Sequence, residues 1–272
     1  MRLDPEAAAA GFRLATHEVL PSTNAAALDY AVQHGGDTQP MWIVAREQTA
    51  GRGRRGNQWI SPPGNLYASL LLIDPAPPRQ APDLSFVAAL GVRDAISDRA
   101  PILANRLALK WPNDVLCDGK KLAGILLEGR MLREKIAVAI GIGVNCRHHP
   151  SNTTYPATDL AAAGAQAGAE ELFAGLSAAM VRRLAQWRSG AGFSAVRADW
   201  LAWAAGIGET MRVRLPEREL VGRGEGLDDN GCLLLRLADG CLQTIAAGEV
   251  FPLTGEVEHG VHHKQMATDG AK

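Results

Sequence analysis

The sequence lacks an excess of charge of either sign, a cysteine framework and a long apolar run. Its 272 residues carry 28 Lys and Arg against 29 Asp and Glu, a formal net charge of −1, so no overall field attracts DNA or an anionic membrane. Apolar runs fall short of the ~18 residues of a membrane span, and the charged N-terminus does not resemble a signal peptide. We expect a cytoplasmic protein that binds neither DNA nor membrane.

Cysteines are few and scattered along the chain. The four, Cys117, Cys146, Cys232 and Cys241, form no CxxC pair, which favours free thiols in a reducing compartment over a disulfide frame or a zinc site. The histidines lack acidic or cysteine partners at ligand spacing, which also argues against zinc. With 47% hydrophobic residues, the chain can build a sizeable core without such staples.

Hydrophobic patterning changes once along the chain, after Gly206. Before it, helix-period and strand-like segments alternate; after it, short alternating strands punctuated by glycine predict a small β-barrel. We therefore predict an α+β domain over residues 1–206, a small C-terminal β-barrel over 207–256, and a disordered polar tail over 257–272. The expected helices are 25–34, 83–97, 170–188 and 196–203. The expected strands are 41–45, 66–73, 107–110, 122–128, 135–140, 211–215, 219–227, 232–237 and 242–246.

The finer expectations concern turns and loops. Residues 1–18 read as a lead-in strand or arm, and residues 147–168 as a loop with a short helix. Strands 122–128 and 135–140 read as a hairpin through Gly129-Arg130. If strand 107–110 lies at an exposed sheet edge, it could pair with a second copy and give a homodimer.

The most informative stretch is Lys110-Trp111-Pro112-Asn113-Asp114, followed seven residues later by Lys121. It sets two cations, an amide and a carboxylate around a turn between apolar strands. A core does not need that polar density, but a site that handles an anion does. Pro-Asn-Asp is also a good turn sequence in its own right.

A second polar segment, Gly51-Arg52-Gly53-Arg54-Arg55-Gly56, follows a predicted strand. It formally matches the dinucleotide-binding pattern GxGxxG, but residues 57–64 contain Pro62-Pro63 and cannot form the required helix. A mobile loop whose arginine forks hold phosphate or carboxylate oxygens fits better. A solvated basic turn is the alternative, and Trp59 beyond it can cover a ring or simply pack.

Five motifs follow one another along the chain: Ser22-Thr23-Asn24, Gln48 to Gly56, Lys110 to Asp114, Lys121 to Leu126, and Gly141-Ile142-Gly143-Val144-Asn145. Taken in order, they resemble the signature series of biotin protein ligases, from about residue 17 to 256. The resemblance implies a class II synthetase-like mixed sheet flanked by helices, with an SH3-like C-terminal barrel. It also implies a two-step reaction, in which ATP activates biotin as biotinyl-5′-AMP and the biotinyl group passes to one lysine of the biotin carboxyl carrier protein of acetyl-CoA carboxylase.

The resemblance also implies residue roles. Ser22, Thr23, Asn24 and Gln48, with Gly53 and Gly124 nearby, would bind biotin; Arg52 and Arg54 would hold carboxylate and phosphate oxygens. Lys121 would bridge the biotin carboxylate and the α-phosphate, and Asp114 would orient Lys121 or the incoming lysine. The nucleotide would lie against Trp59, Lys110, Asn113 and Asn145. Mg²⁺ would be bound to the ATP phosphates, and the resemblance implies no protein ligands for it.

Two departures and two rival functions accompany this resemblance. Only about eighteen residues precede the core, so we expect no DNA-binding domain and no repressor function. No tryptophan follows Asn145 where some members place one over the adenylate; Tyr155 is a possible substitute. The rivals are a lipoate- or octanoate-type protein acyltransferase and a non-catalytic biotin-binding regulator.

Overall fold

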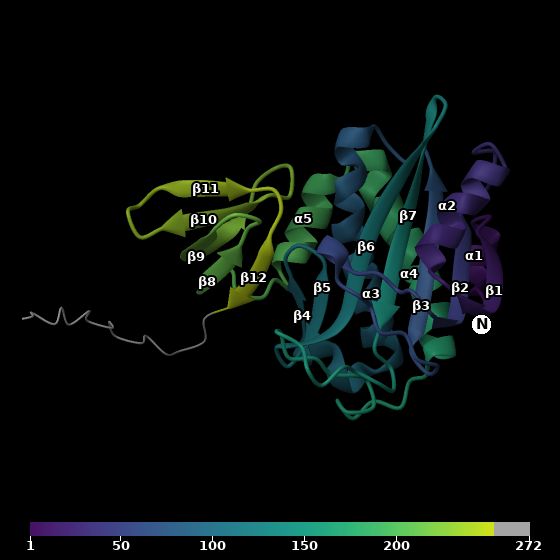
Figure 1. The fold of residues 1–272 in the computed structure, drawn as a ribbon, viewed down its shortest axis with the longest axis horizontal. Coiled ribbons are helices and arrows are strands. Elements are labelled where there is room, and N and C mark those ends of the chain that lie inside the picture. The colour runs from purple at the N-terminus through teal and green to yellow at the C-terminus, as the bar shows by residue number, and fades with distance from the viewer. Residues whose placement is uncertain (253–272) are drawn as a thin grey trace, which may run out of the picture.

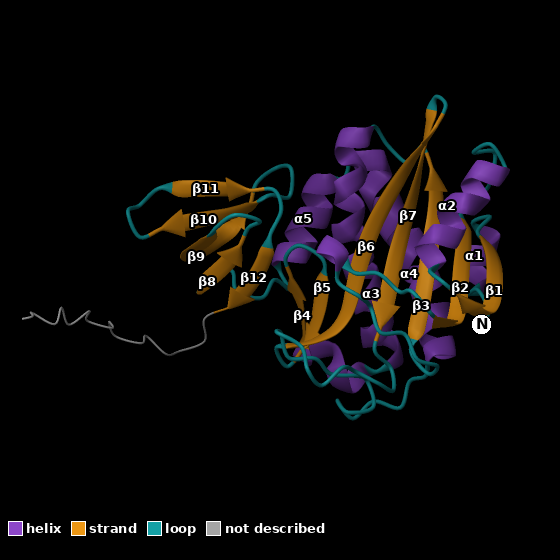
Figure 2. Cartoon of the chain, in the orientation of Figure 1, coloured by secondary structure: helices purple, strands orange, loops and turns teal. Residues whose placement is uncertain are grey.

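Two sheets organise residues 1–252, the part of the chain described by the computed structural model (Figures 1 and 2). The larger sheet contains β1 (Arg13–Leu20), β2 (Met41–Gln48), β3 (Leu66–Ile73), β4 (Leu107–Lys110), β5 (Asp114–Cys117), β6 (Lys120–Leu132) and β7 (Lys135–Val144). The smaller contains β8 (Thr210–Arg214), β9 (Glu219–Leu227), β10 (Leu233–Leu237), β11 (Leu242–Ile245) and β12 (Glu249–Pro252). The helices are α1 (Pro5–Ala9), α2 (Thr23–Gln33), α3 (Leu84–Arg99), α4 (Ala169–Trp187) and α5 (Phe193–Leu201), with 3-10 turns at Arg54–Gly56, Pro78–Asp83, Pro101–Arg106 and Arg188–Gly190.

The larger sheet is mixed, in the order β1-β2-β3-β7-β6-β5-β4. Only β1 and β2 run parallel; the other neighbours are antiparallel. The smaller sheet is antiparallel throughout, in the order β11-β10-β9-β8-β12. In Figure 1 it lies beside the β4–β5 end of the larger sheet. The predicted fold class, a mixed sheet with helices followed by a small all-β unit, is confirmed.

Helices cover the two faces of the larger sheet unequally. On one face α3 and α4 pack along the sheet and enclose the main apolar core. On the other face a smaller cluster joins Ala27, Leu28 and Ala31 of α2 to Ile43 and Ala139. Because α2 is only 11 residues long, it covers part of this face and leaves the rest open.

Strand β7 shows why the open part can become a cavity. Along Lys135–Val144, Ile140, Ile142 and Val144 are buried in the main core, so the alternate residues point to the face of α2. Those alternate residues include Ala139, Gly141 and Gly143, which carry little or no side chain. The sequence of β7 therefore builds a floor with room above it.

Most predicted elements are confirmed, and the strands β3, β4 and β9 have the expected bounds. The predicted hairpin turn at Gly129-Arg130 is wrong: β6 and β7 pair as far as Leu132 and Lys135, and the chain reverses at Arg133, with φ 52°. Strand β5 was not predicted, because the four residues Asp114–Cys117 read as part of the turn. The short helix expected in residues 147–168 is a turn at residues 160–164, and the lead-in arm contains α1.

The smaller sheet docks through backbone and aromatic contacts. Trp111 Nε1 donates to the carbonyl oxygen of Gly231 at 3.0 Å. The proposed boundary at residue 206 falls between α5 and β8. Residues 253–256 of the predicted barrel and the predicted tail 257–272 lie outside the described residues.

The edge strand β4 does not meet the condition set for pairing with a second copy. Its Leu109 N–H donates to Trp203 O at 2.7 Å, and its carbonyl accepts from Ala205 N at 2.8 Å. A homodimer stays a prediction, but pairing through β4 does not support it. Within residues 1–252, no helix combines the length and apolar character needed to cross a membrane.

Candidate active site

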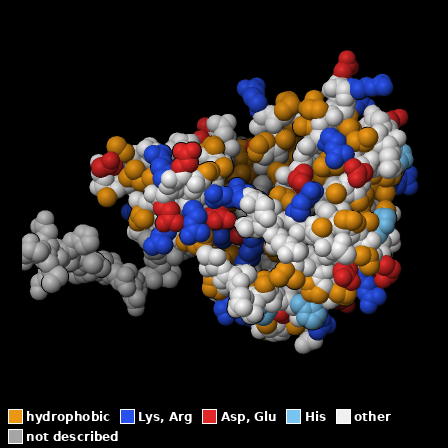
Figure 3. Space-filling view, in the orientation of Figure 1, with side chains coloured by type: hydrophobic (Ala, Val, Ile, Leu, Met, Phe, Trp, Pro, Cys, Tyr) orange, Lys and Arg blue, Asp and Glu red, His pale blue; other side chains and the backbone are white. Residues whose placement is uncertain are grey.

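A cavity of about 550 Å³ opens on the uncovered face of the larger sheet, where that sheet meets β12. Figure 3 shows Lys and Arg side chains gathered near this junction. Every site residue predicted from the sequence lines this cavity: Ser22, Thr23, Asn24, Gln48, Arg52, Gly53, Arg54, Trp59, Lys110, Asn113, Asp114, Lys121, Gly124 and Asn145. The five motifs therefore converge on one place, although they span more than a hundred residues of sequence.

Cross-strand pairing explains the convergence. Lys110 pairs with Asp114, Asp114 with Gly124, and Gly124 with Gly143. Paired residues project to the same face of a sheet. The four residues therefore form one row across this face, with the charged side chains of Lys110 and Asp114 at one end and the two glycines at the other. The charged end and the glycine floor of the cavity are thus set by the register of β4, β5, β6 and β7.

The glycines of the floor make room for two specific side chains. A Cβ at Gly143 would lie 2.6 Å from Trp59 Nε1, and a Cβ at Gly124 would lie 2.9 Å from Trp59 Cζ3. A Cβ at Gly141 would lie 2.5 Å from Asn24 Oδ1. Trp59 and Asn24 therefore lie directly on the sheet, and side chains at these three positions would push them away.

One end of the cavity is a hydrogen-bonded polar pocket at the start of α2. Ser22 caps this helix by accepting from Ala25 N, which leaves Thr23 and Asn24 on its first turn. Thr23 donates from its backbone N and its hydroxyl to Gln48 Oε1, at 2.8 and 3.1 Å. The Oγ of Ser69 lies 2.8 Å from Thr23 Oγ1 and donates to Asn24 Oδ1 at 2.6 Å.

Ser69 was missed by the sequence analysis. It is fully buried, and it is the one aliphatic hydroxyl in the buried strand segment around it, Leu66-Tyr67-Ala68-Ser69-Leu70-Leu71. A lone serine in a buried strand needs hydrogen-bond partners. That break in the pattern was the available signal.

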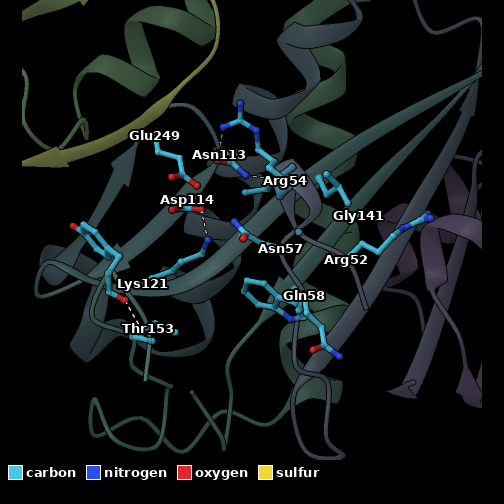
Figure 4. Close-up of a pocket in the computed structure, with 18 of the residues that line it drawn as sticks. Arg52, Arg54, Asn57, Gln58, Asn113, Asp114, Lys121, Gly141, Thr153 and Glu249 are labelled. Atoms are coloured by element: carbon cyan, nitrogen blue, oxygen red, sulfur yellow. Dashed lines mark hydrogen bonds and ion pairs between the residues drawn. The ribbon is translucent and has the colours of Figure 1, made fainter. Parts of the chain in front are cut away.

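The middle of the cavity holds a buried carboxylate between two ammonium groups. Asp114 Oδ2 lies 3.1 Å from Lys110 Nζ, and Asp114 Oδ1 lies 2.7 Å from Lys121 Nζ. Burial alone would raise the pKa of Asp114, but the two lysines outweigh it and lower that pKa. Burial lowers the pKa of Lys110, against the opposing effect of Asp114. In Figure 4, Lys121 points from the sheet toward Asp114, so its ammonium group is held over the floor.

The arginine loop reaches three different partners. Arg54 donates to Asn113 Oδ1 and to Gly248 O, both at 3.3 Å, and burial lowers the pKa of its guanidinium. Arg52 instead points away from this group in Figure 4 and pairs with Glu128 Oε2 at 2.9 Å. Of the two arginines predicted to hold anions, Arg54 therefore reaches Asn113 and the backbone next to β12, while Arg52 reaches Glu128, which also accepts from Asn24 of the polar pocket.

The far end of the cavity is formed by the segment after β7. Asn145 donates from Nδ2 to Thr158 O at 3.0 Å. Lys110 Nζ lies 4.2 Å from the centroid of the Tyr155 ring. The Tyr155 ring also faces Phe251 of β12, with 6.5 Å between the ring centroids. An aromatic side chain, Tyr155, thus lies at this end, where no tryptophan follows Asn145 in the sequence.

Carboxylates near the cavity are already committed to cations. Asp114 has its two lysines, Glu128 has Arg52, and Glu249 lies 3.9 Å from Arg55. Within residues 1–252, no group of three or more His, Cys, Asp or Glu side chains is placed to hold a metal ion. The cavity is therefore arranged to hold anions, with one polar pocket and one aromatic end.

Comparisons with known proteins agree with this arrangement. Residues 17–145 match the model of the Biotin/lipoate A/B protein ligase family, and residues 206–251 match the Biotin protein ligase C terminal domain. The Biotin–[acetyl-CoA-carboxylase] ligase of Paracoccus denitrificans is 44% identical over 237 residues, covering 85% of this chain and 96% of that protein.

Two further comparisons extend to a longer relative and to a solved structure. The Bifunctional ligase/repressor BirA of Bacillus subtilis is 34% identical, covering 87% of this chain and 73% of that protein. A solved biotin protein ligase from Aquifex aeolicus, in complex with biotin and ATP, has a TM-score of 0.73 and 27% identity, covering 89% of this chain and 98% of that one. With such similarity across both domains, the chain belongs to the biotin protein ligase family.

Proposed function

We propose that this protein is an ATP-dependent ligase that converts biotin to biotinyl-5′-AMP and then transfers the biotinyl group to one lysine of the biotin carboxyl carrier protein of acetyl-CoA carboxylase. The observation that carries the proposal is the position of Lys121, between a small polar pocket and an aromatic end. The polar pocket suits the polar head of the acid, Lys121 suits the anionic groups that react, and the aromatic end suits the nucleotide.

The first step joins two anions, so it needs positive charge at the junction. A carboxylate oxygen of biotin forms a bond to the α-phosphorus of ATP while the bond to pyrophosphate breaks. Lys121 and Arg54 would stabilise the charge on the phosphate oxygens as it builds. Asp114 would position Lys121 through its 2.7 Å ion pair, so the ammonium group is already oriented when the substrates arrive.

We propose that Thr23, Asn24 and Gln48 bind the ureido end of biotin and that Trp59 and Asn145 bind the adenine. The hydrogen-bonded network of the polar pocket fixes donors and acceptors in place before biotin enters, which favours one ligand orientation. Mg²⁺ would be bound by the phosphate oxygens of ATP and would reduce their charge. The polar side chains lining the cavity are mainly cations and amides, which suits a metal delivered with the nucleotide.

The second step requires the adenylate to be kept from water until the carrier lysine arrives. Loop residues 51–56, held through Arg54 to the residue just before β12, would cover the mixed anhydride. The lysine amine then forms an amide with the biotinyl carbonyl, and AMP leaves.

The same proposal includes the domain boundaries at 206 and 256, a cytoplasmic location and the absence of DNA binding. A cytoplasmic location is in keeping with an enzyme that needs ATP.

Pyrophosphate release is the experiment that tests the proposal. With biotin and Mg-ATP, we expect release without carrier protein, followed by biotin on a single carrier lysine when carrier is added. Release with lipoate or octanoate but not biotin would replace the substrate and keep the fold. Biotin binding with no pyrophosphate release would support the regulator instead.

A further inference from the structure

The segment that leaves β7 forms the nucleotide end of the cavity, and one buried side chain holds its first residues. Asn152, Thr153, Thr154 and Tyr155 line the cavity. The far end of the segment is tied to β6, since Lys121 N donates to Pro156 O at 2.7 Å and Thr158 N donates to Lys121 O at 2.9 Å. Its near end depends on Asn65, the residue just before β3.

Asn65 makes four hydrogen bonds to this near end. Its Oδ1 accepts from three consecutive backbone N–H groups, those of Cys146 at 2.8 Å, Arg147 at 2.9 Å and His148 at 3.1 Å. Its Nδ2 donates to His148 O at 2.8 Å. Asn65 is only 3% exposed, so water cannot readily replace it.

The neighbouring residue shows how tightly the two segments meet. Gly64 has φ of 107°, a conformation suited to glycine, and a Cβ there would lie 3.4 Å from Arg147 and from His148,. The chain before β3 and the chain after β7 are thus in contact where Asn65 makes its bonds. Asn145, proposed to bind adenine, directly precedes the first of the three N–H donors.

We infer that Asn65 is a positioning residue for the nucleotide half of the reaction. By fixing residues 146–148, its side-chain amide sets the direction in which the chain leaves β7 and so places Asn145 and the segment 152–155 around ATP. The polar pocket at α2 makes no hydrogen bond to Asn65 within residues 1–252. Loss of the amide should therefore weaken ATP binding and leave biotin binding unchanged. This inference rests on the proposed function.

The test compares Asn65→Ala, Asn65→Asp and a control. Asn65→Ala removes the acceptor of all three N–H groups, and we expect KM for ATP to rise by about tenfold or more, the effect of leaving buried donors unpaired. Asn65→Asp keeps an oxygen that can accept three N–H groups, but it replaces the Nδ2 donor to His148 O with a second acceptor, so KM for ATP should fall between that of the Ala variant and that of the wild type. Biotin affinity, measured by calorimetry without ATP, should stay within about twofold in both.

Ser177→Ala is the matched control. Ser177 is fully buried on α4 and accepts from Asp4 N at 3.0 Å, so its loss also removes a buried acceptor, but far from the cavity. It should change neither KM. If Asn65→Ala does not fold, Asn65→Ser replaces it, because its shorter hydroxyl reaches at most part of the three donors and should give an intermediate KM for ATP.

The outcomes separate the two levels of proposal. Wild-type protein that releases no pyrophosphate would overturn the proposed function. Wild-type activity with an unchanged KM for ATP in the folded Ala or Ser variant would overturn the role of Asn65 alone. Equal changes in ATP and biotin binding, or an Asp variant no better than Ala, would also overturn it, because both would indicate a general structural role.

Discussion

Gly143→Ala should impair ATP use while leaving the fold intact. The added methyl carbon would lie 2.6 Å from both Trp59 Cε2 and Nε1, well inside van der Waals contact. Trp59 is half-buried and its Nε1 has no hydrogen-bond partner within residues 1–252. The indole can therefore swing toward solvent, and the strand β7 need not break.

The size of the effect follows from what the displaced ring would have contributed. An aromatic contact is worth about 0.5–1.5 kcal/mol beyond the area it buries, so we expect a loss of about 1–2 kcal/mol in nucleotide binding. That corresponds to a rise of about five- to thirtyfold in KM for ATP. The free energy of unfolding should fall by less, because the ring moves into water and no buried group is left unpaired.

Pyrophosphate release kinetics and a double-mutant cycle test the argument. If the methyl group acts through the indole, Trp59→Ala should raise KM for ATP similarly, and the double variant should be no worse than either single one. Gly141→Ala is the matched control, because its methyl group would meet Asn24 at 2.5 Å and should raise KM for biotin instead. Additive effects of Gly143→Ala and Trp59→Ala would refute the reasoning.

Three further substitutions probe charge. Lys121→Ala should slow adenylate formation by about a hundredfold or more with much less effect on biotin affinity, because its charge is needed as the phosphate reacts; equal losses in single-turnover and binding experiments would contradict this. Burial raises the pKa of Asp83 from 3.8 to about 6, partly offset by its bond from Trp187. The folded state therefore holds that proton more tightly than the unfolded state. The free energy of unfolding should decrease as pH rises from 4 through 6, by up to about 3 kcal/mol. In urea titrations, Asp83→Asn should be more stable than the wild type at pH 8 but not at pH 4. Glu128→Gln removes the charged partner of Arg52. We expect free biotinyl-AMP to escape several-fold faster in a trapping assay, while the free energy of unfolding changes by less than ~1 kcal/mol. An unchanged rate of escape would mean that the Arg52–Glu128 pair does not hold the loop.

The elements predicted best from sequence are those whose local pattern and tertiary setting agree. Strand β3 is an apolar run between turn residues, and its bounds were predicted to the residue. The β6–β7 turn was misplaced because Gly129 offered a local turn signal, whereas the structure continues the pairing and reverses at Arg133. Arginine at positive φ has no sequence signature, so this turn could only be found from the pairing of its strands.

Motif residues of the site were found because their side chains carry the chemistry. Asn65 escaped notice because its partners are backbone N–H groups 81 to 83 residues away, which no spacing rule connects to it. The same holds for the acceptors Gly248 O and Val250 O, which bind Arg54 and Lys110 through atoms common to all residues. Such contacts depend on the docking of β12, and they become visible only in three dimensions.

Those backbone acceptors also explain why the small C-terminal sheet belongs to the active site. Lys110 Nζ lies 3.3 Å from Val250 O, so β12 both buries this lysine and supplies one of its hydrogen bonds. Arg54 reaches Gly248 O, in the residue just before β12, and this contact fixes the middle of a loop that glycines would otherwise leave free. Because the contacts are made to carbonyl oxygens, side-chain changes on β12 can preserve them while removal of the strand cannot. The charge arrangement around Asp114 is therefore a property of the two sheets together.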